Sequence, residues 1–283
     1  MNLADVMPPT PIPHPEWLPV VGIAPLSEAE GIRLANSLPV TPWFVLSYGG
    51  LRHGLDRAFV TGPFEDPEAV IVQHRSAPTE PEYFGKNPEA AWSLLSRIPG
   101  WSCVNGPTTD MRELVPVLER ELRLPYQWLG DLFYSLQVPP VPHTHPSVRL
   151  LEIADIPLLQ RAAPEIWLGG YRTYEEALTE GVSAGAIIDG EIVSLADNSA
   201  GNGRYADIGV KTLEPYRRRG LSSAAVYLVA RELRSRGLVP TWSTGSHNIG
   251  SQRVATKLGF QRHGRGEYVV FDGLQKTGGF QPA

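Results

Sequence analysis

The densest positive charge of this chain lies in the segment YRRRG (216–220), directly before the helix-like run LSSAAVYLVARELRS. A glycine turn that opens a helix presents several free backbone N–H groups, and the helix dipole adds partial positive charge. Glycine lets a ligand approach closely, and arginine supplies donors and fixed charge. Arginines at a helix start oppose the dipole, so helix stability alone does not explain them. The segment predicts an anion site, most often a phosphate site.

Two common phosphate-binding motifs are missing from the sequence. It has no GxxxxGK[ST] loop, and no GxGxxG follows a strand, because Gly201 and Gly203 precede one. What matches is RRRGLS (217–222), which fits R-x-x-G-x-G/A with Ser222 at the last small position. A nucleoside triphosphatase loop and a dinucleotide fingerprint are therefore not supported.

The loop resembles the coenzyme A pyrophosphate loop of the GNAT superfamily of acyl-CoA N-acyltransferases. Downstream, TWSTGSHNIGSQRVATKLGF (241–260) resembles the second signature of that family: a strand, Asn248 at a helix start, and a Lys-Leu-Gly-Phe ending. The resemblance covers about residues 148–271 and looks closest to two-domain members, whose amino-terminal half is a reduced relative of the catalytic half. It implies a GNAT-like mixed-sheet α/β fold.

The resemblance implies acetyl-CoA as co-substrate and no metal. The pantetheine arm would lie between two splayed parallel strands, with backbone contacts from Val210 and Thr212 and a bond from Asn248. The pyrophosphate would be held at Arg217, Arg218, Arg219, Gly220, Leu221 and Ser222. A backbone donor near Val210 would stabilise the oxyanion as an amine attacks the thioester.

Asp207 lies near the place where many family members carry a glutamate base, and we expect it to accept the amine proton; the alternatives are a solvent-facing strand carboxylate and a water chain. The usual general acid is a tyrosine seven residues after the Asn, but that position is Ala255. Either Tyr205 or Tyr227 protonates the thiolate, or no residue does. His247 is more often structural at a helix start, and Cys103 is expected to be an ordinary strand residue.

Residues 166–181 are expected to form the acceptor site together with the amino-terminal domain. Trp167, Tyr171, Tyr174 and Glu175 could present aromatic walls and a carboxylate to a cationic amine; the alternative is a partly buried amphipathic helix. The acceptor would be a small amine such as an antibiotic, an amino acid or a polyamine. Acetylation of a protein amine and a non-catalytic acyl-CoA-binding or regulatory module are the alternatives.

Composition limits the class of protein. The chain has 283 residues, 42% hydrophobic content and a formal net charge of −5, which predicts folded domains and argues against a nucleic-acid partner. One cysteine excludes an internal disulfide. No apolar run of about 18 residues and no signal pattern are visible. We expect a cytoplasmic protein without a membrane partner, with a homodimer as one arrangement.

The proline-rich stretch VPPVPHTHPSV (138–148) suggests a domain boundary. We predict an amino-terminal α/β domain at 1–140, a linker at 141–147, a catalytic domain at 148–272 and a tail at 273–283. Two linker histidines, His143 and His145, are too few ligands to indicate a metal site.

The elements that would position these residues follow from local patterns. In the amino-terminal part we expect, after an irregular lead-in, a helix from the Ser27/Glu30 capping box, strands at 41–49, 69–75, 101–105 and 131–138, and helices from Asn87 to Ile98 and from Asp110. In the second part we expect strands at 148–153, 205–213 and 238–244, a hairpin at Asp189-Gly190, and a last strand or hairpin at 260–271. We also expect three helices there: one capped by Asp155, one at 216–237 that ends at Gly237, and one at 246–259.

Overall fold

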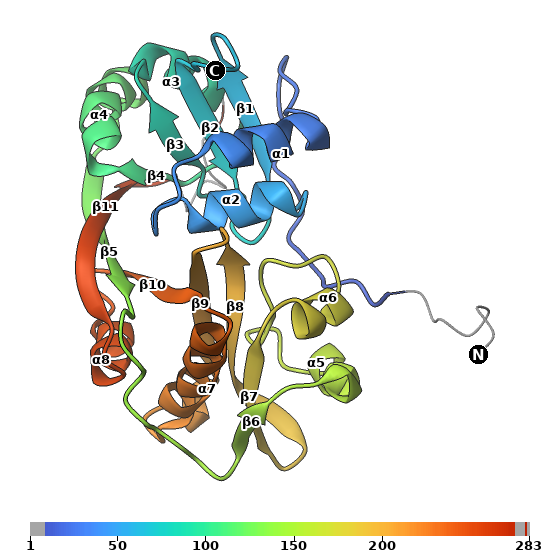
Figure 1. Ribbon diagram of the computed structural model, residues 1–283. Coiled ribbons are helices and arrows are strands. Elements are labelled where there is room, and N and C mark those ends of the chain that lie inside the picture. The colour runs from blue at the N-terminus through green and yellow to red at the C-terminus, as the bar shows by residue number, and fades with distance from the viewer. Residues whose placement is uncertain (1–8, 275–280, 282–283) are drawn as a thin grey trace, which may run out of the picture.

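The computed structural model describes residues 9–274 and residue 281. Within them, one continuous mixed sheet carries eleven strands in the order β1-β2-β3-β4-β11-β5-β10-β9-β8-β7-β6, and helices pack against it (Figure 1). The fold is α/β with a mixed sheet, as the sequence predicts. Among the described residues no helix is both long and apolar enough to cross a membrane.

The amino-terminal part contributes nine elements. They are α1 (Glu28–Ser37), α2 (Val45–Arg52), β1 (Arg57–Thr61), β2 (Ala69–Gln73), β3 (Glu82–Gly85), α3 (Pro88–Leu95), β4 (Cys103–Pro107), α4 (Thr108–Leu122) and β5 (Tyr126–Ser135).

The carboxy-terminal part begins with an edge strand and two short helices and then repeats a similar pattern. Its elements are β6 (Val148–Leu150), the 3-10 turn η1 (Ile153–Asp155), α5 (Ile156–Gln160), α6 (Tyr174–Thr179), β7 (Ser183–Ile188), β8 (Glu191–Gly201), β9 (Tyr205–Thr212), the 3-10 turn η2 (Glu214–Tyr216), α7 (Leu221–Ser235), β10 (Val239–Gly245), α8 (Ile249–Lys257) and β11 (Gln261–Phe271).

After β6, and apart from the two 3-10 turns, the carboxy-terminal part has the same order of elements as the amino-terminal part: two helices, three strands, a helix, a strand, a helix and a last strand. In each part a helix connects a parallel pair, β3 with β4 through α3 and β9 with β10 through α7. A reduced GNAT-like amino-terminal half and a boundary at residue 140 stay predictions.

The last strand of each part lies beside the other part. Strand β11 pairs antiparallel with β4 and β5, and β5 pairs antiparallel with β10. In Figure 1 these two long strands run along the left side and connect the upper and lower halves. The exchange buries Leu132, Tyr134 and Leu136 in the carboxy-terminal core, and Val269 and Phe271 in the amino-terminal core.

Many local predictions are confirmed. Ser27 and Glu30 form a reciprocal capping box, and the Asn87 side chain caps α3 by accepting from the Ala90 N–H. Asp189 and Gly190 both have positive φ in the β7–β8 hairpin, as the two-residue turn requires. The helix α7 is followed by Gly237 in the left-handed region.

The predicted strand at 41–49 is wrong, because residues 45–52 form the helix α2. Their aromatic and β-branched content favours a strand only where a strand partner exists. Here the segment packs on the carboxy-terminal sheet, and a Cβ at Gly49 would lie 2.8 Å from the Ala200 Cβ. A bare helix face therefore fits against β8, and tertiary packing overrides local propensity.

Two further helix predictions need correction. Helix α3 ends at Leu95 rather than Ile98. Asp155 precedes α5 but does not cap it; its carboxylate accepts the Glu152 N–H at 2.9 Å and pairs with Arg149 at 2.6 Å.

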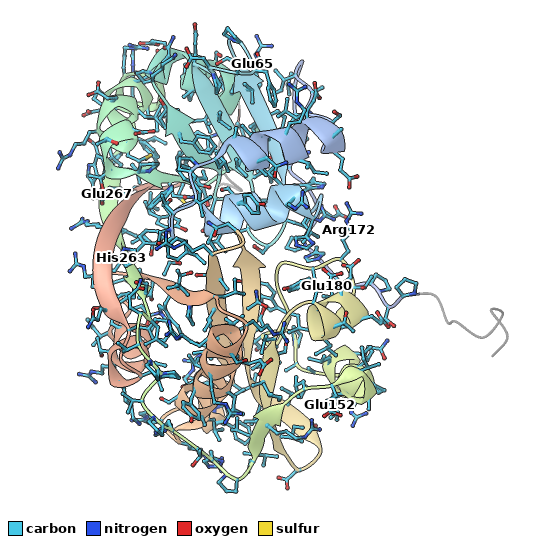
Figure 2. All side chains as sticks on the ribbon, in the orientation of Figure 1. Glu65, Glu152, Arg172, Glu180, His263 and Glu267 are labelled. Atoms are coloured by element: carbon cyan, nitrogen blue, oxygen red, sulfur yellow. The ribbon has the colours of Figure 1, made fainter. Side chains whose placement is uncertain are left out.

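The amino-terminal lead-in crosses both parts of the molecule without a helix of its own. Thr10 donates its N–H to Glu175 Oε2 at 2.9 Å, and Ile12 donates its N–H to the Arg172 carbonyl. Arg172 also reaches the Glu28 carboxylate of α1 at 2.6 Å, and Figure 2 labels it between α6 and the amino-terminal helices. The segment therefore holds α6 against the amino-terminal part.

Candidate active site

The parallel strands β9 and β10 separate soon after they meet. Their pairing covers Tyr205 to Asp207 opposite Val239 to Thr241, although β9 continues to Thr212 and β10 to Gly245. On its other side β9 stays paired with β8 as far as Thr212. In the described part, residues 208–212 therefore present one edge without a strand partner, and this is the splay that the resemblance requires.

The start of α7 is open, in contrast to the equivalent start of α3. At α3 the Asn87 side chain already accepts one of the free N–H groups. At α7 the capping position is Gly220, with φ of 80° and no side-chain cap, and Arg218 also has positive φ, at 62°. The first amides of α7 are therefore available to a ligand, as the sequence predicts for an anion site.

The cations around this helix start are exposed and largely unneutralised. Arg217, Arg218 and Arg219 are exposed and form no ion pair among the described residues. Arg217 Nε donates to the Thr212 carbonyl at 3.2 Å. From the predicted linker, His143 lies so close that a Cβ on Gly220 would be 3.2 Å from its Nε2. Lys257 Nζ lies 3.3 Å from the same nitrogen. The three arginines and Lys257 make this surface positive, whereas burial and the Lys257 charge lower the pKa of His143.

The helix α8 lies after the diverging end of β10. Asn248 caps it, and the Asn248 Oδ1 accepts the Ser251 N–H at 3.1 Å, which leaves the side-chain NH₂ for a ligand. Ala255, at the usual tyrosine position, is fully buried in the core. His247 is exposed beside Gly245.

A cavity of about 350 Å³ lies between the two parts of the molecule and reaches the splayed edge of β9. Val210, Asp207 and Ser199 line it from the carboxy-terminal part, and Trp43 and His74 from the amino-terminal part. The cavity therefore joins the predicted thiol-arm groove to residues of both halves.

Asp207 lines this cavity and is the last residue of β9 that pairs with β10. Ser199 Oγ donates to its Oδ2 at 3.0 Å, and Thr241 Oγ1 lies 3.5 Å from Oδ1. Burial, with a further contribution from the Asp197 charge, raises the pKa of Asp207 to about 6, although the hydrogen bonds oppose this. A carboxylate with that pKa is ionised at neutral pH and basic enough to accept a proton.

Asp131, on β5, also lines the cavity and was missed by the sequence reasoning. It is 8% exposed, and burial followed by the negative charge of Asp207 raises its pKa to about 7. It lies opposite Gly245 of β10 and Gly266 of β11. No local pattern could reveal it, because only the strand exchange brings β5 into the carboxy-terminal sheet.

A charged group from the amino-terminal part lies on the opposite wall. His74 Nδ1 lies 2.7 Å from Asp56 Oδ2, and its Nε2 lies 3.4 Å from Glu82 Oε2. Burial lowers the pKa of His74, but the two carboxylates outweigh it and raise the pKa to about 10. His74 is therefore a buried imidazolium at neutral pH.

The expected acceptor residues lie in different places. Trp167 lines the cavity, with Lys211 Nζ 3.9 Å from its ring centroid. Tyr171 and Tyr174 are only 7% and 8% exposed and pack in a core cluster, and the Tyr171 hydroxyl donates to Asn198 Oδ1. Glu175 accepts from the Thr10 backbone. These last three residues do not line the central cavity, and their role in acceptor binding stays a prediction.

The other candidates lie away from the cavity. Tyr205 and Tyr227 do not line it, whereas Tyr268 does. Burial first and then the Asp131 charge raise the pKa of Tyr268 well above its usual range. Cys103 is a buried residue of β4, as expected, and burial raises the pKa of its thiol.

An open phosphate-type cradle beside a splayed parallel pair, with a carboxylate at the splay, is the geometry of an acyl-CoA acyltransferase. Residues 144–271 match the family model of the GNAT acetyltransferases. Residues 144–271 therefore form a GNAT acetyltransferase domain, and the protein is an acyltransferase.

Solved structures support the fold over most of the chain. A GCN5-related N-acetyltransferase-like protein from Streptococcus suis has a TM-score of 0.61 at 16% identity, over 87% of this chain and 100% of that one. A GCN5-related N-acetyltransferase from Kribbella flavida gives 0.54 at 16%, over 86% and 96%. A tandem GNAT protein from the clavulanic acid biosynthesis pathway gives 0.51 at 12%, over 87% and 96%. No curated protein sequence matches this chain.

No group of three or more His, Cys, Asp or Glu side chains that could hold a metal occurs in residues 9–274.

Proposed function

We propose that this protein transfers the acetyl group of acetyl-CoA to a primary amine of a small molecule. The observation that carries the proposal is one cavity that reaches both the unpaired edge of β9 at Val210 and the carboxylate of Asp207. A thioester beside that edge and an amine beside that carboxylate would share one space.

The donor side would be held by the chain's own backbone and cations. The open amides at the start of α7, with Arg217 to Arg219, would bind the pyrophosphate, and the linker residue His143 and Lys257 add donors at the same surface. The unpaired edge of β9 would bind the pantetheine arm in the manner of an added strand, with Asn248 on the far side. Acetyl-CoA supplies the activated thioester.

On the acceptor side, Asp207 would accept the proton of the incoming ammonium. Ser199 Oγ donates to one carboxylate oxygen at 3.0 Å and Thr241 Oγ1 lies 3.5 Å from the other, so the carboxylate is held in place at the cavity wall. A backbone N–H near Val210 would bind the negative charge that develops on the carbonyl oxygen, worth about 3 kcal/mol for such donors. With Ala255 buried, the thiolate would leave without a dedicated acid from α8.

A steady-state assay that follows free thiol release with acetyl-CoA and a panel of primary amines tests this proposal. We expect turnover that depends on both substrates and a product with one added acetyl group by mass. Calorimetry with coenzyme A separates the alternative, because a regulatory module would bind coenzyme A without turnover on any amine. Failure to bind coenzyme A would contradict the proposal at its first step. The cytoplasmic location and a homodimer stay predictions.

A further inference from the structure

The central cavity contains carboxylates that the protein does not neutralise. His74 already pairs with Asp56 and Glu82, and Glu82 also accepts from Ser47 Oγ. The lining carboxylates that make no ion pair in the described part of the chain are Glu80, Asp131 and Asp207. Buried carboxylates without a partner are costly, so a ligand with at least one ammonium group would relieve this cost.

One cationic side chain that lines the cavity lacks an anionic partner in the described part of the chain. The Arg75 guanidinium makes no hydrogen bond and no ion pair among residues 9–274, and its buried Nη1 has no partner. Its ring contact is with Trp17, 4.7 Å from the guanidinium carbon to the centroid. Trp43 Nε1, on the same part of the molecule, is a second buried donor without a partner. Buried donors are nearly always satisfied, so Arg75 Nη1 and Trp43 Nε1 each lack an acceptor in the described part of the chain.

A second arginine, Arg57, lies close to Arg75. Arg57 stacks on the same Trp17 ring at 4.6 Å, and both arginines line a second cavity that adjoins the central one. Arg57 is bonded to Gln73 Oε1 and the Leu18 carbonyl, both uncharged. Burial and the Arg75 charge lower the pKa of Arg57 to about 10. Asp56 also lines the second cavity, but its carboxylate pairs with His74. Neither arginine side chain has a carboxylate partner among the described residues, so the two cations favour an anion.

We propose that the acetyl acceptor carries an anionic group besides its amine, and that Arg75 binds this group across the cavity from Asp131 and Asp207. The acceptor is an amino-acid-like compound with a carboxylate or phosphate. This inference rests on the proposed function, because it specifies the acceptor of the same site.

The test compares acceptors that differ only in the anion. Straight-chain ω-amino acids from glycine to 6-aminohexanoate are each assayed beside their neutral amides, with aminoalkyl phosphates as a third arm. We expect kcat/KM for the best carboxylate or phosphate to exceed that of its neutral counterpart by about 10–100-fold, as for a charge-assisted hydrogen bond. The arm with the higher value identifies the anion. Equal values for the charged and neutral members throughout would overturn the proposal.

Two variants test the assignment to Arg75. Arg75→Gln is expected to raise KM for the charged acceptor and remove the discrimination, with little change for the amide, and Arg75→Lys is expected to restore part of it. If Arg75 had only a structural role, Arg75→Gln would lower kcat/KM for the charged acceptor and for its amide by the same factor, and this result would overturn the proposal. Arg57→Gln is the matched control, because it contacts the same ring but does not line the central cavity. An equal loss of discrimination in this control would also overturn the role of Arg75.

Binding without acetyl-CoA distinguishes this inference from the proposed function. Trp43 and Trp167 line the cavity, so fluorescence quenching and calorimetry report acceptor binding directly. If no amine is acetylated but the charged acceptor binds more tightly and needs Arg75, the proposed function fails and the anion site stands. If amines are acetylated without regard to the anion, the anion site fails and the function stands.

Discussion

Replacing Asp207 with Asn is expected to make the protein more stable and less active at pH 8. Burial raises the pKa of this carboxyl from 3.8 to about 6. Each pKa unit corresponds to about 1.4 kcal/mol, so the ionised carboxylate costs the fold about 3 kcal/mol. The variant also loses the charged acceptor of the Ser199 hydroxyl, which lowers its free energy of unfolding by about 1 kcal/mol. We expect a net gain of about 2 kcal/mol in the free energy of unfolding.

The pH dependence follows from the sign of the shift. Because the pKa of Asp207 is higher in the folded state, its destabilising effect is absent below pH 3.8, grows between pH 3.8 and about 6, and is complete above that range. The advantage of the Asn variant should therefore increase by about 1.4 kcal/mol between pH 5 and pH 8. The charge of Asp207 also raises the pKa of Asp131, so its removal acts in the same direction.

Urea unfolding of both proteins at pH 5 and pH 8 measures the effect, and Asp66→Asn is the control. Asp66 is 78% exposed in a surface ion pair, so its replacement should change stability by less than about 0.5 kcal/mol at either pH. Acetylation by Asp207→Asn should fall by about 100-fold or more, as for loss of a general base. Equal stability of variant and wild type at pH 8, or a gain that does not grow with pH, would refute the reasoning from burial.

Three other changes test the donor site and the strand exchange. Gly220→Trp should abolish coenzyme A binding by calorimetry while circular dichroism is retained, since the helix start is open; unchanged affinity would contradict the loop assignment. His143→Ala should weaken coenzyme A binding by about 3–10-fold if it adds one hydrogen bond to the phosphates, and an identical dissociation constant would remove it from the site. Residues 141–283 expressed alone should lack a cooperative unfolding transition, because β5 is missing between β10 and β11. Residues 124–283, which include β5, are the matched control. A cooperative transition in the fragment 141–283 would show that the carboxy-terminal part folds without the exchanged strand and would refute this prediction.

Local sequence predicted the open start of α7 and the position of Asn248 at the start of α8, because both features are local. The turn, the free amides and the arginines all belong to residues 216–222, and the capping role of Asn248 needs only its own helix. The strand–helix–strand order around them follows from hydrophobic periodicity and short-range turn signals. Gly220 was therefore singled out from its neighbouring residues, whereas Asp207 was proposed through the family resemblance.

The acceptor side could not be predicted in the same way. Asp131, His74 and Arg75 reach the cavity only through contacts between distant parts of the chain. Helix α2 was predicted as a strand because nothing in its own residues shows that Gly49 will lie against Ala200. Tyr171 was expected in the site on its aromatic character, but a buried hydrogen bond to Asn198 places it in the core.

The exchange of the last strands explains why one protein needs both halves. Both halves place a parallel pair and a helix in the same order, but Asn87 satisfies the start of α3, whereas Gly220 leaves the start of α7 open. The amino-terminal half thus has no equivalent anion site, and its contribution is instead the wall of the cavity. Because β5 inserts beside β10, Asp131 comes close enough to Asp207 for the Asp207 charge to raise the pKa of Asp131. Under the proposed function, Arg75 and Asp131 would come from the half whose helix start is capped, so neither half alone would form the site.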